Sequence, residues 1–142
     1  MISNAVLEHV VDLELFFSEV NRVTKSLGVS YHLYHNYYSF SGCHLQQSLC
    51  EKHPWGHLRG KYQTNPNHLN QIRIESVSKI ISSCFELINI FQVSKDHSKK
   101  GVDEGFRYER EDLLTPWIRN ELKEFSREEL LTRSYLIVGK KK

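Results

Sequence analysis

The feature that most constrains the fold is a long apolar segment that runs from Pro66 to Val93. Its apolar side chains recur at intervals of three and four residues, which is typical of a helix. They form two adjacent stripes: Val77, Ile80, Cys84, Leu87 and Phe91 in one, and Ile74, Ile81, Phe85 and Ile88 in the other. Asn65 is a suitable N-cap, and Pro66 suits the first helical position because its missing N–H is not needed there. The pattern predicts a central helix over Pro66–Val93, contacted from more than one side.

Three further segments have helical signals. Residues 4–28 repeat apolar positions at helical spacing and end at Gly28. Thr115 followed by Pro116 begins another helix, and Ser126 with Glu129 forms a capping box for a shorter one. The sequence therefore predicts a single domain over residues 1–142 with an all-α fold, a small bundle of four to five helices.

Two short segments fit both helix and strand. Residues 31–40 alternate like a strand, yet Leu33, Tyr37 and Phe40 also share a helical face. We favour a helix there because the neighbouring segments are predicted to be helical. Residues 134–138 are too short for periodicity to decide. The remainder of the Tyr31–Asn65 segment is predicted to be rich in loops, since Gly42, Pro54 and further Gly and Pro residues interrupt it.

Composition limits the cellular setting and the partners. Acidic residues interrupt any apolar run near the N-terminus, so no signal peptide is expected. The most apolar run is too short to span a membrane. Three cysteines, an odd number, indicate reduced thiols and a cytoplasmic protein. The net charge of +2 is too small for a strong overall field, so an electrostatic partner must be argued from local charge.

One candidate metal site lies in the histidine-rich middle of the chain. Cys43, Cys50, His53 and His57 offer two thiolates and two imidazoles, a ligand set that tetrahedral zinc accepts. His32 and His35 are further candidate ligands. The six residues between the two cysteines do not match a known zinc-finger spacing. The alternative is that the thiols are buried as small apolar groups and the histidines lie on the surface.

The same region predicts binding of an anionic partner, nucleic acid above all. Between Gly28 and Arg73 there are four cations and one acid, Glu51, a local charge of 4 − 1 = +3. Lysine and arginine side chains follow phosphates, and aromatic rings stack on unpaired bases. The predicted binding residues are Tyr34, Tyr38, Lys52, His57, Arg59, Lys61, Tyr62 and Arg73. This hypothesis describes a non-catalytic binding domain.

Two alternatives remain open. One is an oligomeric protein-interaction domain, with a homodimer formed through the apolar excess of the helix predicted over 66–93. The other is a metal-independent ribonuclease, which needs a base, an acid and a cation. His57, His68, Arg59 and Tyr62 have the right chemical types for this reaction. No nucleotide-binding, calcium-binding or hydrolase motif occurs, so no cofactor besides zinc is suggested.

Overall fold

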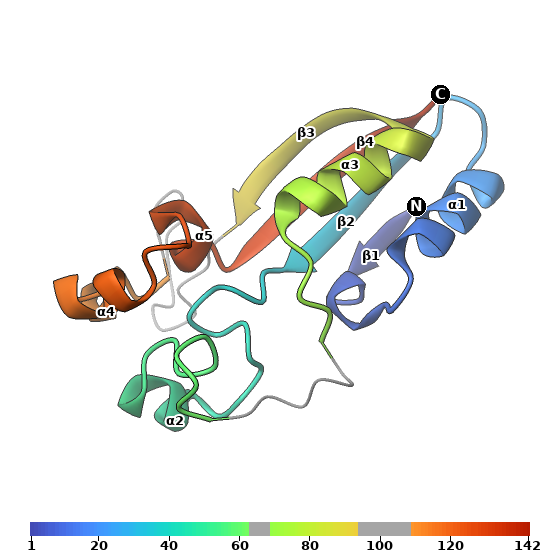
Figure 1. Cartoon of the computed structure of the whole chain (residues 1–142). Helices are drawn as coiled ribbons and strands as arrows, with labels where there is room; N and C mark the ends of the chain where they lie inside the picture. The colour runs from blue at the N-terminus through green and yellow to red at the C-terminus, as the bar shows by residue number, and fades with distance from the viewer. Residues whose placement is uncertain (63–68, 94–108) are drawn as a thin grey trace, which may run out of the picture.

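The computed structural model describes residues 1–62, 69–93 and 109–142, and these form a mixed α/β fold around a four-stranded sheet (Figure 1). The strands are β1 (Ile2–Asn4), β2 (Val29–His35), β3 (Phe85–Val93) and β4 (Ser134–Lys141). Their order across the sheet is β1-β2-β4-β3. β1 runs parallel to β2, whereas β4 is antiparallel to both β2 and β3. The prediction of an all-α helical bundle is therefore wrong.

The largest correction concerns the segment that was predicted to be one central helix. Helix α3 covers only Ile74–Cys84, and the chain passes directly into β3 at Phe85. Phe85, Ile88 and Phe91 continue a three-residue spacing, but an apolar run of this length also suits a strand. Pairing with β4 from Phe85 to Val93, interrupted by one bulge between Leu87 and Asn89, decides between the two. The predicted helix start at Asn65 and Pro66 lies outside the described residues.

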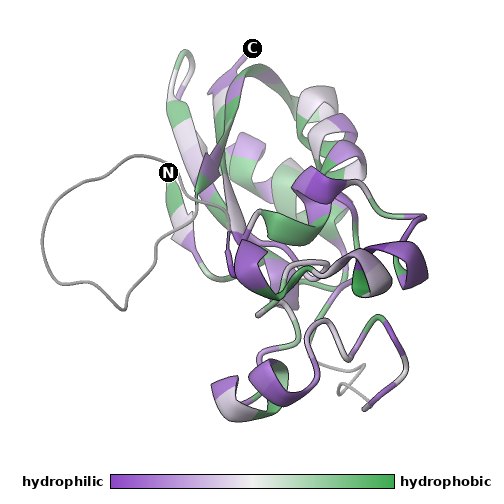
Figure 2. Cartoon of the chain, turned by 90° about the vertical axis from the view of Figure 1, so that its left-hand side faces the viewer, coloured by the Kyte–Doolittle hydropathy of each residue, from purple (hydrophilic) through white to green (hydrophobic). Residues whose placement is uncertain are grey.

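The two segments that fitted both helix and strand contribute the central strands. Helix was favoured for residues 31–40, but Val29–His35 is β2, with Ser30, His32 and Tyr34 buried on one face. Residues 134–138 belong to β4. Tyr31 and Phe91 are exposed on the opposite face. Figure 2 shows polar and apolar residues mixed along the strands, as expected for a sheet with one face covered by helices.

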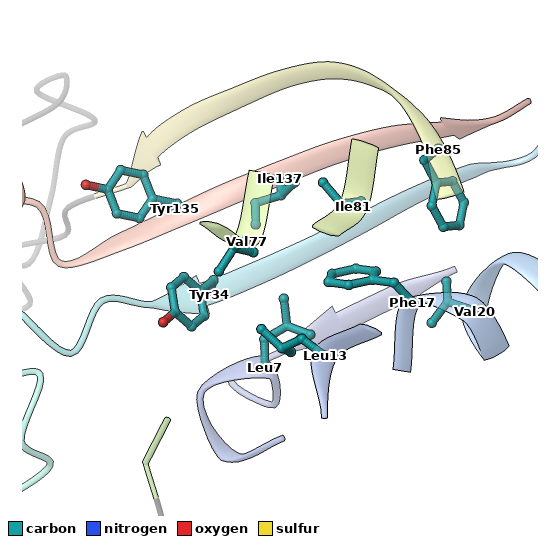
Figure 3. Close-up of a cluster of buried hydrophobic side chains, with 10 residues drawn as sticks. All are labelled: Leu7, Leu13, Phe17, Val20, Tyr34, Val77, Ile81, Phe85, Tyr135 and Ile137. Atoms are coloured by element: carbon teal, nitrogen blue, oxygen red, sulfur yellow. The ribbon is translucent and has the colours of Figure 1, made fainter. Parts of the chain in front are cut away.

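Helices α1 (Leu13–Val23) and α3 pack side by side on the covered face of the sheet (Figure 1). The predicted helix over 4–28 is thus shorter, since β1 and the 3-10 turn η1 (Leu7–His9) precede it and Asp12 caps it. Side chains from both helices, η1 and the sheet meet in one core (Figure 3). Its buried members are Leu7, Leu13, Phe17, Val20, Tyr34, Val77, Ile81, Phe85, Tyr135 and Ile137. Val77 and Ile81, which belonged to the proposed homodimer face, are among them.

A second core joins the short helices α2 (Gln47–Lys52), α4 (Pro116–Glu121) and α5 (Arg127–Leu131), together with the 3-10 turn η2 (Glu111–Leu113). Its buried centre is made by Phe40, Cys43, Cys50, Trp55, Ile118, Leu122, Phe125, Leu130 and Leu131. The predicted starts of the last two helices are confirmed, because Thr115 and Ser126 accept hydrogen bonds from the N–H groups of Ile118 and Glu129.

Candidate metal centre

The candidate site lies at the end of the sheet where β1 and β2 both finish (Figure 1). Because these strands are parallel, the residues that follow β1 lie beside the last residues of β2. Glu8 stands in η1 just after β1, and His35 is the last residue of β2. His44 comes from the turn beyond β2, where its φ of 54° places it in the left-handed region. Local turns and strand pairing thus bring together three residues from separate parts of the sequence.

The donor atoms of these three side chains have the spacing of metal ligands. Glu8 Oε1 lies 3.6 Å from His35 Nδ1, and His35 Nδ1 lies 3.4 Å from His44 Nε2. All three donor atoms lie within 4.8 Å of one another. Two ligands of a tetrahedral ion stand about 3.3 Å apart when both bonds are about 2.0–2.1 Å long. The observed separations are close to this value and too long for strong direct hydrogen bonds.

Glu8 is the unusual member of the set, because it is a buried carboxylate that accepts no hydrogen bond within the described residues. Its residue is 1% exposed, and neither oxygen makes a hydrogen bond within the described part of the chain. Burial raises the pKa of Glu8. The backbone N–H groups of Glu8 and His35 and the side chain of His9 lower it by smaller amounts, although neither N–H is in hydrogen-bonding geometry. Buried carboxylates are normally paired, hydrogen-bonded or bound to a metal ion. A cation between Glu8 and the two imidazoles would supply the missing partner.

The two histidines are held in the neutral form that binds metals. Burial, followed by electrostatic interactions with His44, Arg133 and His9, lowers the pKa of His35 to about 4. Burial, followed by His9 and Arg133, also lowers the pKa of His44. A neutral imidazole offers a free nitrogen lone pair to an ion, whereas an imidazolium does not.

A hydrogen-bond network fixes the backbone that carries Glu8. The Asn70 N–H donates to the Glu8 carbonyl at 2.7 Å, and the Asn70 side-chain amide donates to the carbonyls of Leu7 and of Val10, the latter at 2.9 Å. The buried Tyr34 hydroxyl donates to Asn70 Oδ1 at 3.2 Å and also contacts the Ile72 carbonyl. Tyr34 therefore acts in the core, one step behind the site, rather than on the surface.

Two more basic side chains border the three ligands. His9 Nε2 lies 3.9 Å from Glu8 Oε1, and its ring centre is 5.5 Å from that of His44. Arg133 precedes β4, and its carbonyl accepts a hydrogen bond from the Asn36 N–H directly after His35. The positive charge of Arg133 contributes to the lowered pKa values of both ligand histidines. Within the described residues, the Arg133 guanidinium makes no hydrogen bond or ion pair.

The metal ligands predicted from the sequence come together only in part. Cys43 Sγ and Cys50 Sγ lie 3.5 Å apart as buried free thiols, with the Tyr62 hydroxyl 3.7 Å from Cys43. Burial, followed by the neighbouring Cys43, raises the pKa of Cys50 to about 11. His57 instead contacts the Tyr37 carbonyl through Nε2 at 2.8 Å. Across the part of the chain that the structure describes, only Glu8, His35 and His44 gather three donor atoms closely, so His53 and His57 do not join the thiols.

The predicted nucleic-acid-binding residues occupy different settings. Lys52 and Lys61 are exposed. Arg59 forms an ion pair with Glu121 at 2.5 Å and lies over the Trp117 ring, whereas Arg73 lies 3.4 Å from Glu129. The Arg73 guanidinium also stacks over the rings of Tyr38 and Phe125, at 5.3 and 5.2 Å from their centres. The remaining members, Tyr34, His57 and Tyr62, are buried or half-buried, and His68 of the ribonuclease hypothesis lies outside the described residues.

Sequence reasoning missed Glu8 and His44 entirely and considered His35 only as an accessory ligand. No local spacing connects these residues, since they are brought together by the parallel pairing of β1 with β2 and by the turn that follows. His32, the other accessory candidate, lies in the core instead, where Ser3 Oγ is 2.8 Å from its Nδ1.

Comparison with known proteins gives no relative from which to transfer a function: no family model matches this chain, and no curated protein is significantly similar to it. Among the described helices, none combines the length and the apolar character needed to cross a bilayer.

Proposed function

We propose that this protein binds one divalent transition-metal ion, zinc in the first instance, through Glu8, His35 and His44. The observation that carries the proposal is the buried Glu8 carboxylate, which makes no hydrogen bond within the described residues and lies 3.6 Å from His35 Nδ1, itself 3.4 Å from His44 Nε2. Imidazole and carboxylate together suit zinc and its neighbours in the first transition row better than calcium or magnesium, which prefer oxygen-only sites.

The test is elemental analysis of untagged protein purified without chelators, followed by competition titration with zinc. One equivalent of zinc is expected in the wild-type protein, and Glu8→Gln, His35→Ala and His44→Ala are each expected to lose it. His53→Ala is the matched control, because it removes an imidazole from the other predicted site. Zinc that survives the three ligand substitutions but disappears in Cys50→Ala would overturn the proposal in favour of the cysteine site.

Nucleic-acid binding stays a second proposal, and one surface feature favours it. Arg73 is exposed and lies over the Tyr38 ring, so a cation and a ring, the two groups that bind single-stranded nucleic acid, stand together at the surface, with Glu129 3.4 Å from Arg73. Titration of a labelled single-stranded RNA at increasing salt is the test. We expect affinity that falls steeply with salt and is weakened by Arg73→Gln, whereas Arg22→Gln on α1 serves as the control. Equal effects of the two substitutions would contradict it.

A further inference from the structure

Two thiols that are not ligands of the candidate metal centre meet in the second core. Cys43 Sγ lies 3.5 Å from Cys50 Sγ, although the two residues are seven positions apart in the sequence. Cys43 belongs to the turn that follows β2, and Cys50 belongs to α2. The two sulfur atoms are in contact but not bonded, since a disulfide bond is about 2.05 Å long. They need to approach each other by about 1.5 Å to form that bond.

The surroundings of the pair place it just beneath the surface of the second core. Both cysteines are at most 3% exposed. The hydroxyl of the half-buried Tyr62 lies 3.7 Å from Cys43 Sγ and 4.0 Å from Cys50 Sγ, and the carbonyl of Leu45 is also 4.0 Å from Cys50 Sγ. Because the Leu45 side chain is 37% exposed, the groups that cover the sulfurs are themselves in contact with solvent. An oxidant not much larger than water therefore needs only a local opening to reach them.

The simpler interpretation is that both cysteines serve as small apolar groups of the core. Burial raises the pKa of Cys50 to about 11, so this thiol is protonated at neutral pH and reacts slowly with reagents from solution. Apolar packing alone does not require the two sulfurs to touch, however. Their contact means that a sulfur oxidised at one residue has the other thiol as its nearest nucleophile.

We propose that Cys43 and Cys50 form a reversible disulfide when hydrogen peroxide oxidises the reduced pair, and that this bond joins the turn after β2 to α2. In the first step the peroxide O–O bond breaks, one thiol becomes a sulfenic acid and one water leaves. In the second step the other sulfur attacks the sulfenic sulfur, so that the S–S bond forms, the S–O bond breaks and a second water leaves. The two thiols thus lose two electrons and two hydrogens in all, and the peroxide is reduced to water.

The reverse reaction needs a dithiol reductant, which cleaves the bond by thiol–disulfide exchange. The inference does not rest on the proposed metal binding, because the contact between the sulfurs is an observation of its own. It identifies a site of reversible covalent modification in the short-helix region.

The test treats the whole chain, freed of metal ions by a chelator, with hydrogen peroxide and then digests it with trypsin. Residues 26–52 contain no lysine or arginine before Lys52, so one peptide carries both Cys43 and Cys50, whereas Cys84 lies on another. After oxidation we expect this peptide to be about 2 Da lighter, from the loss of two hydrogens, and to take up no thiol-alkylating reagent. After treatment with dithiothreitol it should regain its mass and be alkylated at both cysteines.

Two variants check that the change belongs to this pair. Cys84→Ser is the matched control, because it removes the third free cysteine and should leave the mass loss unchanged. Cys43→Ser removes the partner of Cys50, so its peptide should keep a thiol or gain oxygen and never become lighter. A wild-type peptide that gains oxygen or keeps both thiols would overturn the proposal. The wild-type protein alone decides this, however well Cys43→Ser folds.

The stability of the oxidised protein tests whether the bond forms within the fold. A disulfide restricts the unfolded chain between the two cysteines, so the urea midpoint of unfolding should be higher in the oxidised protein than after addition of dithiothreitol. The oxidised Cys84→Ser protein should show the same difference, and Cys43→Ser should show none. A lower midpoint in the oxidised wild-type protein would overturn the proposal, because the folded positions of Cys43 and Cys50 would then not accommodate the bond.

Discussion

The sheet region and the short-helix region of this protein are built in different ways. The first packs two helices of 11 residues against strands that pair over long sequence separations. In the second, none of the described helices exceeds six residues, and single side-chain bonds connect the loops: Trp55 Nε1 donates to the Leu130 carbonyl at 3.0 Å. In the sheet region the backbone is held in place by strand pairing, whereas in the short-helix region the loops are held in place by hydrogen bonds of individual side chains. The candidate metal centre stands at the boundary, with His35 on a strand and His44 in a turn.

The largest effect is expected from removing the centre of either core. Trp55 and Ile81 are both fully buried, one in each region. Trp55→Ala should lower the free energy of unfolding by about 3–5 kcal/mol and Ile81→Ala by about 2–5 kcal/mol, from lost burial and the cavity that remains. Urea unfolding followed by circular dichroism measures both. Val11→Ala at a position 93% exposed is the control and should change little.

The shape of these unfolding curves tests whether the two regions are separate. We expect one transition for each variant, because the two regions are joined by hydrogen bonds. Asn36, the residue directly after β2, donates to the carbonyls of Glu129 and Thr132 in the short-helix region. A curve in which Trp55→Ala loses part of the signal early, while the remainder unfolds as in the wild type, would instead show that the sheet region folds alone.

Acid should destabilise both regions through one buried histidine in each. Burial lowers the pKa of His32 in the sheet region and of His57 in the short-helix region to about 4. In the unfolded chain each histidine has its ordinary pKa near 6.5, so the unfolded chain binds more protons than the folded protein between pH 4 and 6.5. The stability that is present above pH 6.5 is therefore lost as the pH falls toward 4. Each histidine should contribute a loss on the order of 2–3 kcal/mol.

The measurement is the unfolding free energy at several pH values for His57→Gln and His32→Gln. Glutamine at position 57 keeps an N–H near the Tyr37 carbonyl, which accepts from His57 Nε2 at 2.8 Å in one tautomer. Each variant should show a smaller decline with acid than the wild type. A decline as steep as the wild type's in both variants would mean that other groups cause it.

Local sequence patterns predicted helices where the local signal was sufficient, and failed where distant pairing decided. The helical repeat around Leu13–Val23 and the caps at Thr115 and Ser126 needed no partner to be recognised. Phe85–Val93 became a strand because of β4, whose sequence lies more than 40 residues downstream. The metal centre could not be predicted from the sequence for the same reason: Glu8 and His44 come together only after β1 pairs with β2.

Asn70 offers a smaller perturbation that should act on the boundary between the regions. Asn70→Ala leaves the carbonyls of Leu7 and Val10 without their side-chain donor, so we expect a loss of about 1–3 kcal/mol in stability. Because these bonds fix the backbone around Glu8, zinc affinity should fall roughly 10- to 100-fold, as for other outer-shell residues. Gln71→Ala is the neighbouring control. Unchanged zinc affinity in a destabilised Asn70→Ala protein would show that Asn70 supports the fold alone.

The smallest expected change in stability has the opposite sign. Because burial raises the pKa of Glu8, its charged form is disfavoured in the folded protein, and the apo protein loses stability as the pH rises from about 4.5 through the folded pKa. Glu8→Gln removes the charge at the same size, so the apo variant should be more stable than the wild type by about 1 kcal/mol at neutral pH. The difference should vanish in acid.

Zinc should reverse this order, because only the wild-type carboxylate can bind it and binding to the folded state adds stability. Thermal unfolding of both proteins, with and without zinc, should therefore show Glu8→Gln as the more stable protein without metal and the less stable one with it. An apo variant less stable than the wild type would mean that the Glu8 carboxylate already has a favourable partner in the fold, which removes the principal reason to place a metal ion there. The reversal separates a binding group from a structural one, because a purely structural carboxylate would respond to its removal in the same direction under both conditions.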